Sequence, residues 1–188
     1  MVRSIYPLFA VALVACPPAF ASEVVAVPYF DAVGLRGGGD VEIVPGPVER
    51  VTIVEGSSRF TRIYVEHQRS LKIESCAGPC PPSYHLRVQI VSPRVPVLAV
   101  DGGGTIRVAP GFAPQRQLVA AVNGGGRIDA RAVDAADVTA AVNGGGDLLV
   151  RAASALTGAV RGGGDIRYWG NPVVTSAIEG GGSIRPGY

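Results

Sequence analysis

In the second half of the chain, apolar residues occupy every second position. One such series runs through Leu118, Ala120 and Val122 and continues at Ile128 and Ala130. A period of two places these side chains on one face of a β-strand, whereas an amphipathic helix would show a period of 3.6. The pattern therefore predicts β-strands that bury one face.

Triplets of glycine interrupt this alternation at regular intervals. The last five triplets begin 22, 20, 18 and 18 residues apart, and the six first glycines are Gly37, Gly102, Gly124, Gly144, Gly162 and Gly180. In register, the last five copies read AVDGGGTIRV, AVNGGGRIDA, AVNGGGDLLV, AVRGGGDIRY and AIEGGGSIRP. A fixed period of this length, with the same strand pattern in each copy, is typical of a solenoid whose coils stack on one another.

The length of the repeat indicates the kind of solenoid. Eighteen to 22 extended residues trace about 60 to 70 Å of chain, which suits one coil of a parallel β-helix. Successive coils would stack about 4.8 Å apart, so equivalent residues would form columns along the stack. We therefore predict an all-β fold in which residues 99–188 form a short parallel β-helix.

The residues before this repeat have a different pattern. Segments at 41–44, 51–54, 63–65, 71–73 and 86–90 alternate apolar and polar residues between turns rich in glycine, proline and serine. We expect residues 22–98 to form β-hairpins that start the solenoid and cap its end, within a single domain over 24–188. A cap is needed because an open end leaves strand backbone unpaired.

The glycine triplets would all lie at one corner of the stack. Holding a glycine in an ordered strand or turn costs about 0.5 to 1 kcal/mol relative to alanine, so the corner must require the missing Cβ. Close stacking of backbones at a sharp bend is the interpretation we favour, and the alternative is a groove of backbone N–H groups that binds an anion. The middle glycines represent this structural corner: Gly103, Gly125, Gly145, Gly163 and Gly181.

Composition narrows the class of protein. The 188 residues are 47% hydrophobic and 17% charged, with a formal net charge of +2, which excludes a disordered chain. The arginines are scattered rather than clustered, which argues against a nucleic-acid partner. No residues have the spacing of a catalytic, cofactor-binding or metal-binding motif, so we predict a non-enzymatic protein with no cofactor.

The N-terminus has the pattern of an export signal. Arg3 precedes an apolar stretch over 5–15, and Ala19 and Ala21 frame a small-residue cleavage site before Ser22. We predict a signal peptide over 1–21 and an exported protein of the periplasm or the cell surface. The alternative is a lipoprotein in which Cys16, at the end of LVAC, carries a lipid anchor; we favour cleavage after Ala21 because the strand pattern begins almost at once.

The two remaining cysteines lie close together, in the segment Cys76-Ala-Gly-Pro-Cys80. This turn-forming segment and an oxidising compartment favour a disulfide between them. A redox-active pair or half of a zinc site is the alternative, but redox pairs are usually separated by two residues and there is no second ligand pair.

Together, these features resemble the bacterial family called the auto-transporter adhesin head domain, or GIN domain. The resemblance is carried by YFDAV at 29–33, GGGDVEIV at 37–44, LKI at 71–73, the glycine repeats, and GDIRYWGNP at 164–172. It implies an exported bacterial protein with a right-handed, pectin-lyase-like parallel β-helix, and a role in adhesion that the family name proposes by analogy.

The candidate ligand surface consists of Asp147, Asp165, Trp169 and Asn171. The two aspartates share a column and would lie about 5 Å apart, which suits calcium binding or glycosidic chemistry, although Arg127 in the same column offers Asp147 a salt bridge. Trp169 has outward parity before the turn at Asn171, where its indole would contact a sugar ring or pack against a neighbouring loop.

These observations favour a non-enzymatic β-helical module of the bacterial cell envelope that acts in adhesion or envelope association. Its partner would be a cell-surface glycan or an envelope protein. The alternative is a β-helix protein that binds or cleaves polysaccharides.

The N-terminal prediction can be tested by mass spectrometry of the intact protein purified from its native bacterium. We expect the mass of an unmodified chain that begins at Ser22. A chain that begins at an acylated Cys16 would show the lipoprotein alternative instead.

Overall fold

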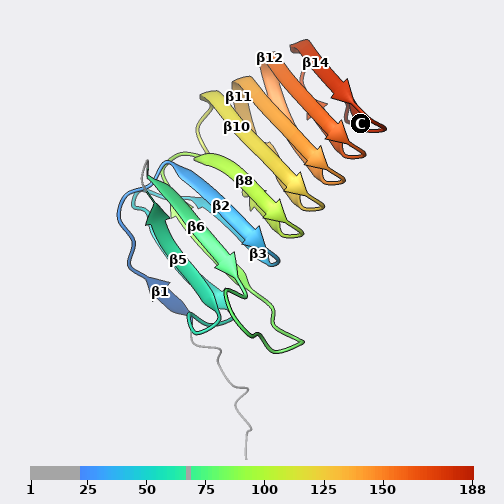
Figure 1. The fold of residues 1–188 in the computed structure, drawn as a ribbon. Coiled ribbons are helices and arrows are strands. Elements are labelled where there is room, and N and C mark those ends of the chain that lie inside the picture. The colour runs from blue at the N-terminus through green and yellow to red at the C-terminus, as the bar shows by residue number, and fades with distance from the viewer. Residues whose placement is uncertain (1–21, 67–68) are drawn as a thin grey trace, which may run out of the picture.

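The computed structural model describes residues 22–66 and 69–188. The predicted signal peptide over 1–21, which includes Cys16, lies outside these described residues. Within them the protein is all-β, with one mixed, mostly parallel sheet that curves round on itself into a near-closed shape (Figure 1). The fifteen strands are β1 (Glu23–Val25), β2 (Ala32–Gly37), β3 (Asp40–Pro45), β4 (Arg50–Glu55), β5 (Thr61–Glu66), β6 (Ser70–Ser75), β7 (Arg87–Ser92), β8 (Val97–Gly102), β9 (Thr105–Val108), β10 (Gln115–Gly124), β11 (Arg127–Gly144), β12 (Asp147–Gly162), β13 (Asp165–Trp169), β14 (Val173–Glu179) and β15 (Ser183–Pro186).

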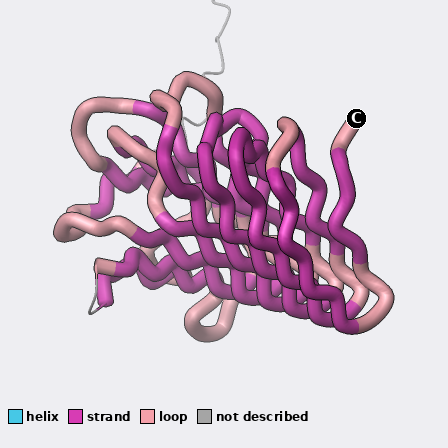
Figure 2. Tube along the Cα trace, turned by 90° about the horizontal axis from the view of Figure 1, so that it is seen from above, coloured by secondary structure: helices cyan, strands magenta, loops and turns pink. Residues whose placement is uncertain are grey.

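Each glycine triplet separates a strand on one face of the stack from a strand on the other. On the face before the triplets, β8, β10, the end of β11, the end of β12 and β14 pair in parallel. On the face after the triplets, β9, the start of β11, the start of β12, β13 and β15 do the same. Figure 2 shows the strands running side by side along the stack.

The pairing register confirms the predicted columns. Leu118 pairs with Val138, which pairs with Leu156, which pairs with Val174. The first glycines of successive triplets pair in the same way, from Gly102 to Gly124 and on through Gly144 to Gly162.

The interior is filled by the inward columns. For example, Ile106, Ile128, Leu148 and Ile166 form one column on the face after the triplets, and each has no exposed surface. Burying a side chain of this size stabilises the fold by about 1.5 to 3 kcal/mol relative to leaving it in water. Because each residue packs on its equivalents in the coils above and below, the columns hold neighbouring coils in register.

The first triplet, at residues 37–39, also forms a coil of this stack, but its place was not predicted. Strand β2 pairs in parallel with both β6 and β8, and β3 pairs in parallel with both β7 and β9. The coil of β2 and β3 therefore lies between the coil of β6 and β7 and the coil of β8 and β9. The order of coils in space differs from their order in the sequence, which alternation within single segments does not specify.

Antiparallel strands cap this end of the stack. Strand β4 pairs antiparallel with β7, β1 pairs antiparallel with β4, and β5 pairs antiparallel with β6. These strands cover the outermost parallel edges, which would otherwise be free to pair with another chain.

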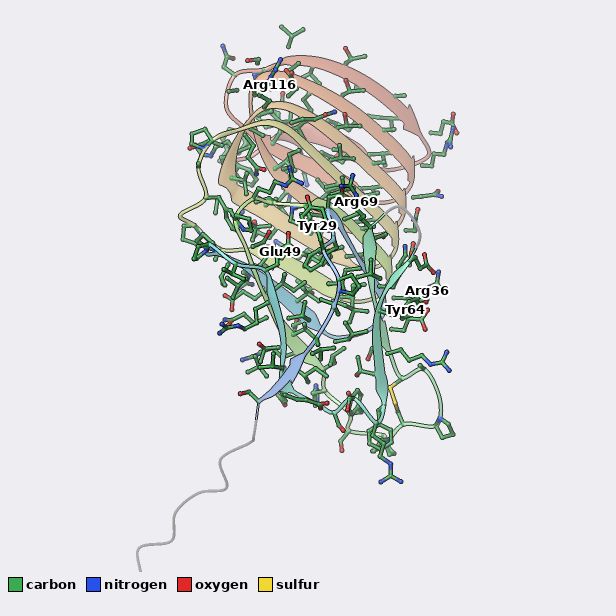
Figure 3. All side chains as sticks on the ribbon, turned by 90° about the vertical axis from the view of Figure 1, so that its left-hand side faces the viewer. Tyr29, Arg36, Glu49, Tyr64, Arg69 and Arg116 are labelled. Carbon is green, nitrogen blue, oxygen red and sulfur yellow. A yellow bond between two sulfur atoms is a disulfide. The ribbon has the colours of Figure 1, made fainter. Side chains whose placement is uncertain are left out.

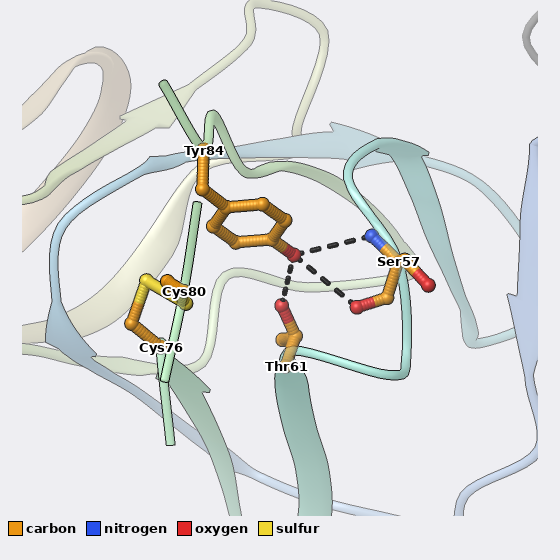
Figure 4. Close-up of a disulfide and its surroundings, with 5 residues drawn as sticks. All are labelled: Ser57, Thr61, Cys76, Cys80 and Tyr84. Carbon is orange, nitrogen blue, oxygen red and sulfur yellow. Dashed lines mark hydrogen bonds between the residues drawn. A yellow bond between two sulfur atoms is a disulfide. The ribbon is translucent and has the colours of Figure 1, made fainter. Parts of the chain in front are cut away.

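In the coil of β6 and β7, a longer loop over 76–86 replaces the glycine triplet. Cys76 and Cys80 lie at disulfide distance, as predicted, with their Cα atoms 5.5 Å apart. The Tyr84 hydroxyl lies 2.6 Å from the Thr61 Oγ1 atom, accepts a hydrogen bond from the Ser57 N–H and donates one to the Ser57 carbonyl oxygen (Figure 4). Since Thr61 is only 4% exposed, Tyr84 satisfies a buried hydroxyl and ties the loop to the cap.

At the glycine corner, the first and third positions of the last five triplets have no room for a side chain. Gly144 has a φ of 122°, and a Cβ there would lie 2.6 Å from the Gly124 carbonyl oxygen of the preceding coil. At the third position, a Cβ on Gly126 would lie 2.7 Å from the Gly104 carbonyl oxygen. The close stacking of coils therefore requires glycine at these positions.

The middle glycines differ from their neighbours in the triplet. They lie at the corner and are exposed, and a Cβ built on Gly145 meets no atom within 4 Å. The Gly145 N–H donates to the Gly124 carbonyl oxygen at 3.0 Å, so this amide pairs with the neighbouring coil and is not free to bind an anion. We expected that Gly145 would have no room for a side chain. The structure shows this restriction at Gly144 and Gly146 instead.

Alanine substitutions should show that the first and middle glycines of a triplet differ in their effect on stability. We expect Gly144→Ala to lower the free energy of unfolding by about 2 kcal/mol or more, because the alanine would combine a positive φ with a clash against backbone. We expect Gly145→Ala to change it by less than about 1 kcal/mol. Urea unfolding followed by circular dichroism measures both, and equal losses in the two variants would contradict this account of the corner.

Candidate functional site

A group of charged side chains projects from the outward face of the strands that follow the triplets. Inward positions on these strands hold aliphatic residues, so the alternation directs every second residue toward solvent. We call this surface the arginine face. It consists of six arginines, Trp169 and three aspartates: Arg107, Arg127, Arg131, Arg151, Arg167 and Arg185, with Asp129, Asp147 and Asp165 between them.

One outward column contains the two aspartates of the predicted ligand surface. Asp147 and Asp165 are paired in register, with Arg127 next to Asp147 and Ser183 next to Asp165. An Asp147 carboxylate oxygen lies 3.2 Å from the Arg127 Nη1 atom, which is the salt bridge that the sequence offers. Asp165 accepts a hydrogen bond from the Ser183 hydroxyl and lies 3.4 Å from the Arg185 guanidinium.

Each of the two aspartates therefore has its own arginine partner, and Asp165 also has a hydroxyl partner. Their negative charges are balanced by these arginines. Within 22–66 and 69–188, no three His, Cys, Asp or Glu side chains come together as ligands for a metal ion. The calcium interpretation of this column has no ligand set in the described part of the chain.

A second column runs from Glu42 through Arg107, Asp129, Leu149 and Arg167 to Arg185. Leu149 lies at an outward position of the strand but is only 3% exposed. The alternation of apolar and polar residues did not predict this burial. No carboxylate of the described residues lies within 4.0 Å of the guanidinium of Arg107 or Arg167. These two arginines are therefore the unpaired cations of the arginine face.

Asp129 and Arg131 form the closest ion pair of this face. The Arg131 Nε and Nη2 atoms donate to the two carboxylate oxygens of Asp129 at 2.9 and 2.6 Å. Burial raises the pKa of the Asp129 carboxyl, but the hydrogen bonds and charge of Arg131 outweigh burial and hold this pKa below its ordinary value. The hydrogen bond to Asp129 correspondingly raises the pKa of Arg131.

Trp169 is packed rather than fully exposed. The Arg131 guanidinium carbon lies 5.0 Å from the centroid of the indole ring, which is a cation–π contact. On the benzo side of the indole, a Cβ on Gly187 would overlap the ring, so the two residues are in close contact. Tyr168 packs against the core, as its inward parity predicts.

The stacked Arg131 and Trp169 side chains separate two shallow depressions, because both residues line each of them. The first depression, of about 540 Å³, is also lined by Arg107, Val108, Asp129, Ala132 and Arg151. The second, of about 430 Å³, is also lined by Arg127, Leu149, Arg167, Arg185, Pro186, Gly187 and Tyr188. The exposed Asn171 lines neither, so the structure does not bring it together with Trp169 in a depression.

Two other clusters of charged and aromatic side chains lie nearer the capped end, and their labelled members are visible in Figure 3. Arg36 pairs with Glu74 at 3.2 Å, and the Tyr64 hydroxyl donates to the same carboxylate. That hydrogen bond is the main reason that the pKa of Tyr64 is raised. In the other cluster, Arg69 pairs with Asp31 and lies over the Tyr29 ring.

The sequence pointed to Trp169 but not to the arginines around it. Arg107, Arg131 and Arg167 all lie at outward positions of their strands. An alignment of the outward positions of successive repeats would therefore have identified them as neighbours. The contact between Trp169 and Gly187 had no such signal, since it depends on the path of the chain after β15.

Removing Arg131 should reverse the shift of the Asp129 pKa. In the wild type the depressed pKa stabilises the fold above the ordinary value of 3.8, and this contribution is lost as the pH falls through the folded-state pKa. In Arg131→Gln the effect of burial remains without its main opposing partner, so we expect the pKa to rise. A carboxyl NMR titration measures it, Arg185→Gln should leave Asp129 unchanged, and an unshifted pKa in Arg131→Gln would contradict the assignment.

None of the described residues forms a helix, so no helix in that part of the chain is able to span a membrane.

Comparison with solved structures shows the same fold in a bacterial protein of known structure. A crystal structure described as a putative adhesin from Bacteroides fragilis NCTC 9343 has a TM-score of 0.50 and 16% sequence identity, covering 88% of this chain and 96% of that one. Another, described as a putative adhesin from Parabacteroides distasonis ATCC 8503, has a TM-score of 0.45 and 17% identity, with coverage of 88% and 96%.

The family match found by sequence comparison covers fewer residues than the motifs that carry the resemblance. No curated protein matches the chain. Residues 113–172, which hold three complete glycine triplets and Trp169 and span β10 to β13, match the model of the family described as "Putative auto-transporter adhesin, head GIN domain". This is the family that the sequence resembles.

Proposed function

We propose that this chain is an exported, non-enzymatic module of the bacterial cell envelope that acts in adhesion or envelope association. The observation that carries the proposal is the arrangement of outward side chains in fixed columns on a stiff stack of coils. Ion pairs between neighbouring coils, such as Arg127 with Asp147 and Arg161 with Glu179, hold these columns in place. The family description as an adhesin supports the same function.

The proposal includes a specific architecture. We place the fold in the class of right-handed, pectin-lyase-like parallel β-helices, with 22–98 as start and cap and 99–188 as the repeated coils. Removal of 1–21 on export would place the mature protein in the periplasm or at the cell surface, without a lipid on Cys16.

A polysaccharide-cleaving enzyme is the alternative, and the electrostatics of the arginine face favour it less. Glycosidases use a carboxyl group whose pKa is raised so that it donates a proton near neutral pH. The pKa of Asp129 is shifted in the opposite direction. Asp147 and Asp165 lie in ion pairs with Arg127 and Arg185 respectively.

The proposed function predicts the behaviour of a strain of the native bacterium that lacks this protein. We expect the strain to attach less well to surfaces or to other cells, and expression of the intact chain to restore attachment. Fractionation should find the protein in the periplasm or at the cell surface. Unchanged attachment together with a periplasmic defect would contradict adhesion, and release of sugars from polysaccharides by the purified protein would contradict the non-enzymatic assignment.

A further inference from the structure

We propose that the arginine face binds an acidic polysaccharide, with Arg107 and Arg167 each holding one carboxylate of the same chain. This inference rests on the proposed function, because it names the class of ligand for the exported module. It is carried by the two depressions on either side of Arg131 and Trp169, since each depression contains one unpaired arginine.

The charges of this face leave these two guanidiniums available. Arg127, Arg131 and Arg185 pair with Asp147, Asp129 and Asp165 respectively. Arg151 lies 3.5 Å from Asp134 and donates to the Arg131 carbonyl oxygen. Arg107 and Arg167 remain exposed and have no carboxylate within salt-bridge distance among the described residues.

The chemistry of an unpaired guanidinium indicates the group that it would bind. Its planar set of N–H donors matches the two oxygens of a carboxylate, as Arg131 shows with Asp129 on the same surface. An anionic group in each depression would therefore find a bidentate partner without displacing an existing ion pair.

The separation of the two arginines indicates a chain rather than a small anion. Arg107 and Arg167 share one column and lie three coils apart, through Asp129 and Leu149. At about 4.8 Å per coil, their backbones are about 14 Å apart along the stack. A single carboxylate cannot contact both guanidiniums, whereas a polymer with repeated acidic groups can lie along the column.

The groups between the arginines favour a sugar polymer over a polyphosphate. Asp129, Asp147 and Asp165 are interleaved with the cations, and they would repel a polyphosphate more than a sugar polymer, because an uncharged ring separates the carboxylates of successive sugar units. The same carboxylates are acceptors for sugar hydroxyls. Leu149, Trp169 and Pro186 add apolar surface to the second depression, which suits the C–H face of a sugar ring.

Binding of alginate oligosaccharides of increasing length to the mature protein tests this inference by calorimetry. Alginate is the probe because each of its sugar units carries a carboxylate. We expect weak binding of the single uronic acid and a sharp gain in affinity once the chain is long enough to span Arg107 and Arg167. Neutral dextran should not bind.

Substitution then identifies the arginines that are responsible. We expect Arg107→Gln and Arg167→Gln each to weaken binding of the long oligosaccharide about tenfold, as for loss of a charge-assisted hydrogen-bonded pair. Because both side chains are exposed and unpaired, the variants should melt like the wild type. Arg62→Gln, an equal change of charge on β5 in the cap, is the matched control and should bind normally.

Three outcomes would overturn the inference. Weakening of binding by Arg62→Gln to the same extent as by the two variants of the arginine face would indicate a general effect of charge. Tighter binding of polyphosphate of equal length through the same two arginines would indicate a phosphate polymer as the ligand. Absence of alginate binding, in a protein whose deletion still lowers attachment, would reject the ligand and leave the proposed function standing.

Discussion

The close approach of backbones at the glycine corner is the constraint on which the rest of the structure depends. In each of the last five triplets, the first glycine turns the chain with a positive φ directly beneath a carbonyl oxygen of the neighbouring coil, at a distance that excludes any Cβ. Because these five triplets meet this condition in the same way, each of their coils is placed in register with the next. The inward columns of aliphatic residues and the outward columns of charged residues both follow from that register.

The sequence predicted those parts of the fold that repeat. Alternation and the spacing of the triplets gave the strand type, the parallel pairing, the columns and the neighbours Arg127 and Asp147. It did not predict where the coil of β2 and β3 lies, because only contacts between distant segments decide which coils are neighbours. For the same reason it identified Trp169 but not its packing against Arg131 and Gly187.

The ion pairs of the arginine face leave positive charge unbalanced. Here the cations outnumber the aspartates between them, so the surplus charge lies at fixed places along the stack. Folding sets the backbone position of each unpaired arginine, whereas its exposed side chain still loses rotamer freedom when a ligand binds.

The placement of the coil of β2 and β3 between two later coils bears on how the protein folds after export. Its parallel neighbours β6 and β8 begin 38 and 65 residues after β2 begins, so this end of the stack depends on closing long loops. Beyond β8, each new coil has only to add to the one before it, which is a local step. We therefore expect the capped end to form slowly, whereas the repeated coils form through local steps.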